Sequence, residues 1–312
     1  MTFHRDLRAT GARACFDPPL QQSAVFAAAL RAMGAGATFR DLSASGRVIG
    51  RALVLSQRVP VIGTVRATLR GPLWLGGVDP RERAEALIGL NRAGLRLIEA
   101  EAPCPSLTTA GYVRVMTPAS LADMPLRRTS AAWEAALHPK WRASLKQGRA
   151  KGPKVRAGRF AGQDAAWLVD TEARLRAERG YRTPLPRLAT AIAATDPAAL
   201  HLIAMHGTDG PIAAMLFVRH GRQATYLLGA TTTEGRAARA HHVLLAEAAR
   251  HLRDEGFSAI DLGTLDTEEA PGLARFKLGA SSTLRTLGGS WLRLPFRGKR
   301  HRSGLAEPHS LR

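Results

Sequence analysis

The chain has 312 residues, 45% of them hydrophobic, which suits one large domain or two of about 150 residues and excludes global disorder. It has two cysteines, without a CxxC pair, and no run of 18 apolar residues, which excludes a disulfide framework, a cysteine zinc site and a membrane span. It carries 45 Lys and Arg against 25 Asp and Glu, a formal charge of +20, and starts without the pattern of a secretory signal, so we expect a basic cytoplasmic protein.

The first half of the chain alternates helical and extended patterns. Helical material at 20–33 precedes three strands, expected at 37–43, 47–59 and 64–75. Asp79 followed by Pro80 has the form of a helix N-cap and first turn, and predicts a helix that ends near residue 92. A strand at 95–101 follows. The order is therefore three strands, a helix and a strand.

The second half repeats this order. Helical patterns come first, at 130–151 and 163–179. Three strands are then expected at 201–206, 211–219 and 223–230, followed by a helix at 237–255 and a strand at 257–262. The repeat predicts an α/β protein with mixed sheets, built from two tandem domains. We expect the first domain at 18–128, the second at 129–296, and a basic tail at 297–312.

A basic segment lies near the start of the predicted second domain. Residues 138–160 contain eight Lys and Arg and no acidic residue. Such a stripe favours a polyanion, namely a nucleotide cofactor, tRNA or an anionic membrane surface, or else it is a solvated basic face. Lys140 and Arg142 either bind substrate phosphates or form the exposed face of a helix packed through Trp141 and Leu145.

A meander of strands that enters a helix through a polar loop resembles the core of the GNAT superfamily of acyltransferases. In that core the central strand splays from its neighbour, the acyl donor lies in the gap, and its pyrophosphate meets the start of the helix, where unpaired N–H groups and the dipole attract anions. The resemblance assigns cofactor binding to Gly235, Arg236, Ala237 and Arg239, although the glycines of the Q/R-x-x-G-x-G/A signature are missing. The alternative is an ordinary basic helix start. The equivalent helix of the first half begins with Asp79, which repels anions.

Four further stretches resemble the Fem family, the peptidoglycan-bridge aminoacyltransferases, and acetyltransferases that share its build of two GNAT domains. They are Pro19-Leu20-Gln21-Gln22-Ser23, Arg70-Gly71-Pro72-Leu73-Trp74, the segment Lys140–Lys146, and the run from Ile260-Asp261-Leu262-Gly263 through Pro271-Gly272-Leu273-Ala274-Arg275-Phe276-Lys277-Leu278-Gly279. The last stretch has the family's strand ending in Asp and Gly, then a short loop and G-x-x-x-F-K. Together the four stretches span residues 19 to 279.

The resemblance to the Fem family places Phe276 and Lys277 at the reacting centre. When an amine attacks an acyl carbonyl, an oxyanion develops, and the Lys277 ammonium suits its stabilisation; the alternative is a surface lysine beside a core phenylalanine. Asp261 either orients the amine and accepts its proton, or caps the loop after its strand. Tyr226 either protonates the leaving thiol or packs on its strand. Asp266, in a loop with other acidic residues, suits a cationic acceptor.

Other kinds of site have no support in the sequence. His241 and His242 are adjacent and diverge on a helix, and there is no HExxH, so we expect no metal site. G-x-S-x-G, Walker and G-x-G-x-x-G motifs are also absent, which argues against an α/β-hydrolase, an NTPase and a dinucleotide-binding enzyme.

We therefore expect an N-acyltransferase whose second domain carries the active site. The expected donor is acyl-CoA as a co-substrate, and the acceptor is an amine on a small molecule, glycan or peptide. Two alternatives remain open. One is a Fem-like transferase that takes aminoacyl-tRNA and acts on a cell-wall peptide precursor, and the other is a non-catalytic protein of the same fold that binds polyanions.

Overall fold

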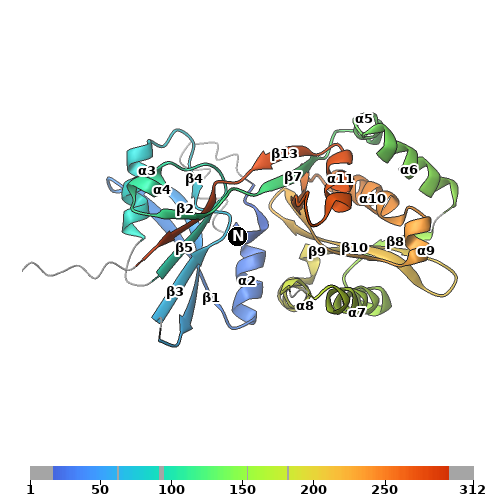
Figure 1. Cartoon of the computed structure of the whole chain (residues 1–312), viewed down its shortest axis with the longest axis horizontal. Helices are drawn as coiled ribbons and strands as arrows, with labels where there is room; N and C mark the ends of the chain where they lie inside the picture. The colour runs from blue at the N-terminus through green and yellow to red at the C-terminus, as the bar shows by residue number, and fades with distance from the viewer. Residues whose placement is uncertain (1–16, 62, 91–94, 153, 181–182, 295–312) are drawn as a thin grey trace, which may run out of the picture.

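The structure of the protein is a computed structural model that describes residues 17–61, 63–90, 95–152, 154–180 and 183–294. Two mixed sheets of seven strands each lie side by side along the long axis of the molecule (Figure 1). The predicted tail at 297–312 lies outside the described residues.

The first sheet has the strand order β1-β2-β3-β5-β14-β6, with β4 paired to β2. Its strands are β1 (Gly36–Ala44), β2 (Arg47–Val59), β3 (Gly63–Thr68), β4 (Leu73–Trp74), β5 (Leu95–Ala100), β6 (Val113–Met116) and β14 (Gly289–Arg293). The helices of this part are η1 (Leu20–Gln22), α2 (Ala24–Ala32), α3 (Pro80–Gly89) and α4 (Ser106–Thr109). Ser23 caps α2, and Asp79 with Glu82 forms a capping box on α3, where the Asp-Pro pair predicts a helix start.

The second sheet has the order β13-β7-β12-β11-β10-β9-β8. Its strands are β7 (Ser120–Pro125), β8 (Lys154–Gly158), β9 (Leu200–His206), β10 (Pro211–His220), β11 (Gln223–Thr231), β12 (Ala259–Thr264) and β13 (Thr283–Thr286). The helices are α5 (Ser130–Ala135), α6 (Pro139–Ala150), α7 (Gly162–Arg179), α8 (Leu185–Thr195), η2 (Pro197–Ala199), α9 (Thr233–Ala237), α10 (Ala240–Asp254) and α11 (Pro271–Gly279).

The predicted repeat is present in the pairing of the strands. In the first sheet β1, β2 and β3 are antiparallel neighbours, and β5 pairs with β3 in parallel. In the second sheet β9, β10 and β11 are antiparallel neighbours, and β12 pairs with β11 in parallel. The two halves therefore share one topology, and the fold class expected from the sequence is confirmed.

The two sheets exchange strands, which the sequence does not predict. β7 follows the first repeat but pairs with β12 and β13 of the second sheet. β14 comes after the second repeat but pairs with β5 and β6 of the first sheet. The division of the chain near residues 128 and 129 therefore does not coincide with the division between the sheets.

Both faces of the second sheet are covered, as the apolar run of β10 predicts. Along β10, Met215 and Phe217 face a core formed with α5, α6 and α10, whereas Leu216 faces a second core formed with α2, α7 and α8. Leu53 of the first sheet is also part of this second core. In Figure 1, α2 lies between the first sheet and α8. Helix α2 therefore joins the two halves of the molecule.

Several predicted elements are divided in the structure. The strand expected at 64–75 becomes β3 and β4, separated at Arg70, whose φ is +50°. The helix expected at 237–255 becomes α9 and α10, separated at Arg239, whose φ is +57°. The helical stretch expected at 130–151 becomes α5 and α6, because Pro139 starts a new helix. Arg70 and Arg239 both lie in the left-handed region that rarely accommodates residues other than glycine.

Candidate active site

The central strands of the second sheet diverge. β11 and β12 are paired only from Gln223 to Thr225 and from Ala259 to Asp261, although β11 continues to Thr231 and β12 to Thr264. A β-bulge in the pairing of β10 with β11, between Leu216 and Phe217, lies next to the point of divergence. The splay expected from the GNAT resemblance is therefore present.

Lys277 belongs to α11, and its side chain reaches the end of β12, beside this divergence. Its side chain is buried, with 7% exposure, and its Nζ donates a hydrogen bond of 2.8 Å to the Thr264 carbonyl. A methyl group on Gly263 would lie 3.7 Å from this Nζ, so the ammonium is directly beside the backbone of the strand end. Burial lowers the pKa of Lys277, and the charge of Asp261 partly opposes this effect.

Phe276 belongs to a cluster of rings at the junction of α6, α10 and α11. The indole of Trp141 donates a hydrogen bond of 3.1 Å to the Phe276 carbonyl, and the two rings are 5.9 Å apart. His242 packs against both rings, at 4.8 Å from Trp141 and 5.2 Å from Phe276. The F-K pair thus places Phe276 in the packing between helices while Lys277 reaches β12.

His242 is a candidate functional residue that the sequence argument missed. Burial, with the charges of Arg239 and His241, lowers its pKa to about 4, so the imidazole is neutral at neutral pH. The neighbouring His241 is held differently, since its Nε2 lies 3.1 Å from the Ala230 carbonyl. A signal was available, because the two histidines occupy the first turn of the helix that follows the splayed strand.

Asp261 is engaged through both of its carboxylate oxygens. Oδ1 accepts the Gly263 N–H at 2.7 Å, and Oδ2 is paired with the Arg70 guanidinium, which comes from the first sheet. Both side chains are buried, with exposures of 4% and 6%. The cap on the following loop, one of the two roles expected for Asp261, is present, and the ion pair with Arg70 is an additional contact.

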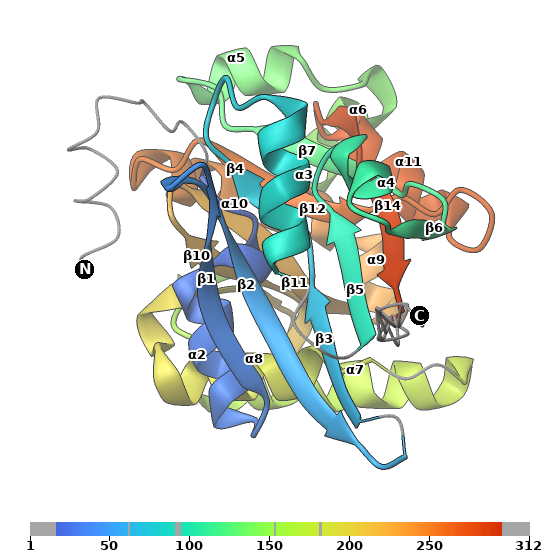
Figure 2. The same ribbon diagram turned by 90° about the vertical axis from the view of Figure 1, so that its left-hand side faces the viewer.

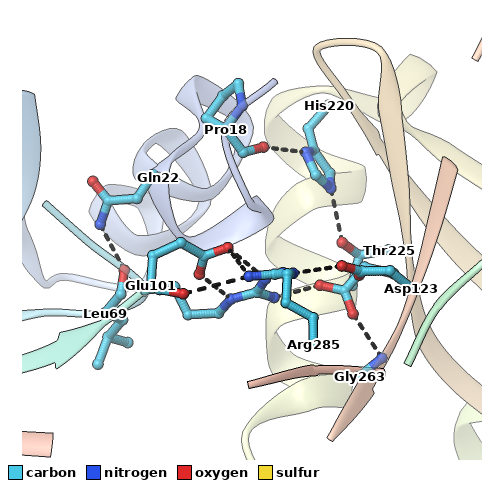
Figure 3. A network of polar contacts seen from close by, with 11 residues as sticks. Pro18, Gln22, Leu69, Glu101, Asp123, His220, Thr225, Gly263 and Arg285 are labelled. Atoms are coloured by element: carbon cyan, nitrogen blue, oxygen red, sulfur yellow. Dashed lines mark hydrogen bonds and ion pairs between the residues drawn. The ribbon is translucent and has the colours of Figure 1, made fainter. Parts of the chain in front are cut away.

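Arg70 and Arg285 form a chain of ion pairs across the junction of the two sheets. Figure 3 shows Arg285 between Glu101 and Asp123. Arg70 also binds Glu101, with Nε to Oε2 at 2.8 Å. Arg285 of β13 binds the same Glu101 at 2.7 Å and Asp123 of β7 at 2.5 Å. Burial alone would lower the pKa of Arg70, but the hydrogen bond with Glu101 and the charge of Asp261 raise it overall. Arg70 therefore keeps its charge.

Tyr226 packs within the second sheet. Its ring lies 5.7 Å from that of Phe217, and both belong to the core beneath α10. A methyl group on Gly229 would lie 2.1 Å from the Tyr226 hydroxyl, so the phenol reaches across this glycine. Of the two roles expected for Tyr226, packing on the strand is the one visible in these contacts.

The predicted anion-binding loop has a different form from that expected. The N–H groups of residues 235, 236, 238 and 239 all donate to groups of the same loop, because α9 closes a turn there. Gly235 is buried, and Arg236 and Arg239 are exposed. In the first turn of α10 the His242 N–H already donates to the Arg239 carbonyl at 3.0 Å, so the N–H groups left over at this helix start are those of Ala240 and His241.

A pocket of about 510 Å³ lies beside α9, between the end of α6 and the end of β9. Lys151 and Lys154 line it together with Glu234 and Ala237, and the Lys151 ammonium donates a hydrogen bond of 2.9 Å to the Ala237 carbonyl. Two ammonium groups at its rim favour a ligand with an anionic part.

The three residues expected to bind substrate occupy different surfaces. Lys140 is exposed on α6, whose buried face includes Trp141 and Leu145. Arg142 donates to the carbonyls of Glu134, Ala135 and Leu137, and so closes the end of α5. Asp266 accepts the N–H groups of the two glutamates that follow it. In the described part of the chain no hydrogen bond or ion pair joins these three residues, and the contacts of Arg142 and Asp266 are to the backbone.

No helix in the described part of the chain is long and apolar enough to cross a membrane. Among the same residues, no cluster of three or more His, Cys, Asp or Glu side chains is arranged to hold a metal ion.

Comparison with known proteins agrees with this geometry. Residues 139–278 match the family model of the acetyltransferase (GNAT) domain. No curated protein matches the sequence. Among solved structures, FemX is similar with a TM-score of 0.74 and 14% identity, over 94% of this chain and 96% of that chain.

Two other solved structures have the same arrangement. One is the C-terminal domain of a putative lysylphosphatidylglycerol synthetase from Agrobacterium fabrum, with a TM-score of 0.54 and 14% identity over 88% of each chain. The other is a conserved protein of unknown function from Bacteroides thetaiotaomicron, with a TM-score of 0.58 and 12% identity over 94% of this chain and 96% of that chain. At these identities the likeness concerns the fold.

Proposed function

We propose that the protein is an enzyme that moves an acyl group from acyl-CoA to an amine. The proposal is supported by the match of residues 139–278 to the acetyltransferase (GNAT) domain and by the likeness of the whole fold to FemX. The observation that carries the proposal is the buried Lys277 ammonium beside the diverging strands β11 and β12. An ammonium in a partly dry cleft is poised for negative charge that develops on a carbonyl oxygen.

The reaction needs a group that stabilises a tetrahedral oxyanion. The amine nitrogen attacks the thioester carbonyl, a C–N bond forms, the C–S bond breaks and the thiol leaves with a proton. Lys277 would hold the oxyanion, a contribution of roughly 3 kcal/mol by analogy with the loss of other oxyanion donors. We assign Asp261 to holding the strand end rather than to accepting the amine proton, because both of its oxygens are engaged.

Replacing the ammonium tests this role directly. We expect Lys277→Met to lower kcat by roughly a hundredfold with the fold retained, because the lost contact exists only in the transition state. Thioester cleavage in the presence of a panel of amines is the measurement, and Arg250→Met, which removes an exposed cation of α10, is the control. Full activity of Lys277→Met would contradict the assignment.

The choice of acyl-CoA as donor is supported by two features of the second sheet. The first turn of α10 faces the end of β11 through the contact of His241 with Ala230, and the N–H groups of Ala240 and His241 would be its donors to a pyrophosphate. The pocket beside α9 adds the ammonium groups of Lys151 and Lys154. Both suit a ligand that carries phosphates at one end and a thioester at the other.

A second donor, aminoacyl-tRNA, is favoured by the basic face of α6 and β8. Lys140, Lys146, Lys151, Lys154 and Arg156 are all exposed there. A row of exposed cations suits a nucleic-acid backbone, and such binding weakens steeply as salt increases. The acceptor remains an amine on a small molecule, a glycan, a peptide or a lipid.

Calorimetric titration separates the two donors. With acetyl-CoA at physiological salt, saturable binding near one per chain, weakened by Arg236→Ala with Arg239→Ala and unchanged by Arg250→Ala, is the expected result. Arg250 is the matched control because it lies further along α10 and pairs with Glu247 on the surface. Tight binding of bulk tRNA without binding of acetyl-CoA would replace acyl-CoA by aminoacyl-tRNA. Polyanion binding with no turnover from either charged donor would favour the non-catalytic alternative.

A further inference from the structure

The contacts around Asp261 connect the first sheet to the site proposed in the second. Three segments far apart in the sequence meet there: Gln22 contacts the chain at Leu69 and Gly71, and Arg70 pairs with Asp261. We propose that Arg70 is a positioning residue for Lys277, which it reaches through Asp261 and the backbone of Gly263. The inference rests on the proposed function in one respect, namely the task given to Lys277.

The first step is the fixed position of Arg70. The buried side chain of Gln22 accepts the Leu53 N–H at 2.7 Å and donates to the Leu69 carbonyl at 2.6 Å, so the chain just before Arg70 is held (Figure 3). Immediately after it, the Gly71 N–H donates to the Glu99 carbonyl at 3.0 Å. The left-handed backbone of Arg70 is costly for a residue with a side chain, and these contacts maintain it.

The second step is the direction of the guanidinium. Nε and Nη2 of Arg70 form a fork on the two oxygens of Glu101, at 2.8 and 3.1 Å, and this fork leaves Nη1 to Asp261 on the other sheet. Arg70 is the cation paired with Asp261, whereas Arg285 pairs with Glu101 and Asp123. The two arginines therefore have separable tasks.

The third step leads from Asp261 to Lys277. Oδ1 of Asp261 holds the Gly263 N–H, and Gly263 has a φ of +80°, which turns the strand end toward Thr264. The Thr264 carbonyl accepts the Lys277 ammonium. The strand that bears the acceptor of Lys277 is thus fixed by a carboxylate whose partner lies on the first sheet.

The same contacts hold the Asp261 carboxylate on Arg70, so that its charge raises the pKa of Lys277 without a direct ion pair to the ammonium. Asp261 is the charged group that affects Lys277 among the described residues, and its pairing with Arg70 leaves the ammonium bonded to a neutral carbonyl. The ionisable groups of the neighbouring α10, His241 and His242, contact Phe276 instead. The carboxylates of the loop before α11, Asp266, Glu268 and Glu269, are exposed.

The experiment follows the Lys277 ammonium itself. The chain has six lysines, so the side-chain resonances of protein labelled with ¹³C-lysine can be followed through a pH titration, and Lys277→Arg assigns the one at position 277. We expect Arg70→Gln to move the titration of Lys277 to higher pH, because the unpaired Asp261 carboxylate turns to the ammonium. Asp261→Asn is expected to move it to lower pH.

Arg285→Gln is the matched control. It breaks the same chain of ion pairs at Glu101 and Asp123 and does not touch Asp261, so Lys277 is expected to titrate as in the unchanged protein. If Arg70→Gln does not fold, Arg70→Lys is used instead. It keeps a positive charge but cannot form the two hydrogen bonds of the guanidinium with Glu101, and its effect is measured on the same Lys277 resonance. A Lys277 titration that is the same in the folded Arg70 variant, in Arg285→Gln and in the unchanged protein would overturn the proposal.

Kinetics give a second reading that distinguishes this inference from the proposed function. Arg70→Gln is expected to lower kcat by about tenfold to a hundredfold with KM for the donor retained, since a displaced catalytic group costs that much. If the protein proves to transfer no acyl group, the proposed function fails, and the titration of Lys277 still decides the role of Arg70.

Discussion

At the scale of single residues, the ammonium of Lys277 lies in a buried position that disfavours its protonated, charged form. Lys277 is 7% exposed, and burial lowers its pKa below the ordinary 10.5. A lysine that stabilises an oxyanion acts in its protonated form, so activity is lost as the pH rises through its pKa. We expect the alkaline limb of kcat at a lower pH than an ordinary lysine would give, and at a still lower pH in Asp261→Asn, which removes the charge that opposes the shift. A limb at the same pH in Asp261→Asn and in the unchanged protein would contradict this assignment.

His220 is a buried residue whose protonation should destabilise the folded protein. It is 4% exposed, its Nδ1–H donates to the Pro18 carbonyl at 3.0 Å, and its Nε2 accepts the Thr225 hydroxyl at 2.7 Å, so it is buried in its neutral form (Figure 3). Burial lowers its pKa from 6.5 to about 4. The contribution of His220 to the free energy of unfolding is therefore fully present above pH 6.5. It decreases by roughly 3 kcal/mol as the pH falls toward 4.

Urea unfolding between pH 7 and pH 4 measures this loss. We expect His220→Gln to be less stable at pH 7, because buried hydrogen bonds change, and to lose less stability on acidification than the unchanged protein. An equal loss in both proteins would show that His220 is not the group responsible.

The motifs made some of these residues predictable and left others hidden. Lys277 and Phe276 follow from G-x-x-x-F-K, and Asp261 from the end of an apolar strand. The partner of Asp261 does not follow, because Arg70 lies 191 residues away and on the other sheet. The role of Arg142 was also hidden, since its bonds go to backbone carbonyls that any sequence supplies.

At the scale of elements, the loop between β11 and α10 is shaped by close packing. Gly235 is buried, and a methyl group there would lie 2.4 Å from the Ile212 carbonyl oxygen and 2.4 Å from the Thr231 hydroxyl. We expect Gly235→Ala to lower stability by about 1–3 kcal/mol through overpacking. Gly272→Ala is the matched control, because nothing lies within 4 Å of the added methyl group at the start of α11. Equal thermal unfolding temperatures for the two variants would contradict this account.

The apolar periodicity of the sequence predicts most helices and strands that pack on a core, and it fails where local backbone conformation decides. β2 was expected at 47–59 and is found there, and β10 and α7 differ from expectation by one residue at an end. The break between α9 and α10 depends on the left-handed conformation of Arg239, which has no sequence signal because arginine rarely adopts it. Short strands such as β6 and β13, in which every residue is exposed or half-buried, have no apolar pattern to detect.

At the scale of the whole molecule, the sequence indicates a tandem repeat and the structure adds the exchange of β7 and β14. Each sheet contains an inner strand that belongs in sequence to the other half, and the Leu287 N–H donates to the Ala119 carbonyl where the two crossing segments meet. Figure 2, which views the molecule from the end of the first sheet, shows β14 entering that sheet beside β5. Neither sheet is complete without a segment from the other half.

We expect one cooperative unfolding transition, because loss of either sheet removes an inner strand from the other. Differential scanning calorimetry measures this, and the calorimetric and van't Hoff enthalpies should agree. Asp261→Asn, which cuts the ion pair between the sheets, should lower the transition temperature without dividing the transition. Two separate transitions in the unchanged protein would show that the sheets unfold independently.

The exchange of strands also determines when each sheet can be completed during translation. A ribosome makes β1 to β6 early, yet the space between β5 and β6 is filled by β14, at residues 289–293. The half of the protein that is made first is therefore the half that is finished last, and its β5 edge stays open while the second half is translated. An open strand edge on a nascent chain is a site for wrong pairing, so the first sheet is exposed to such pairing until β14 has been translated.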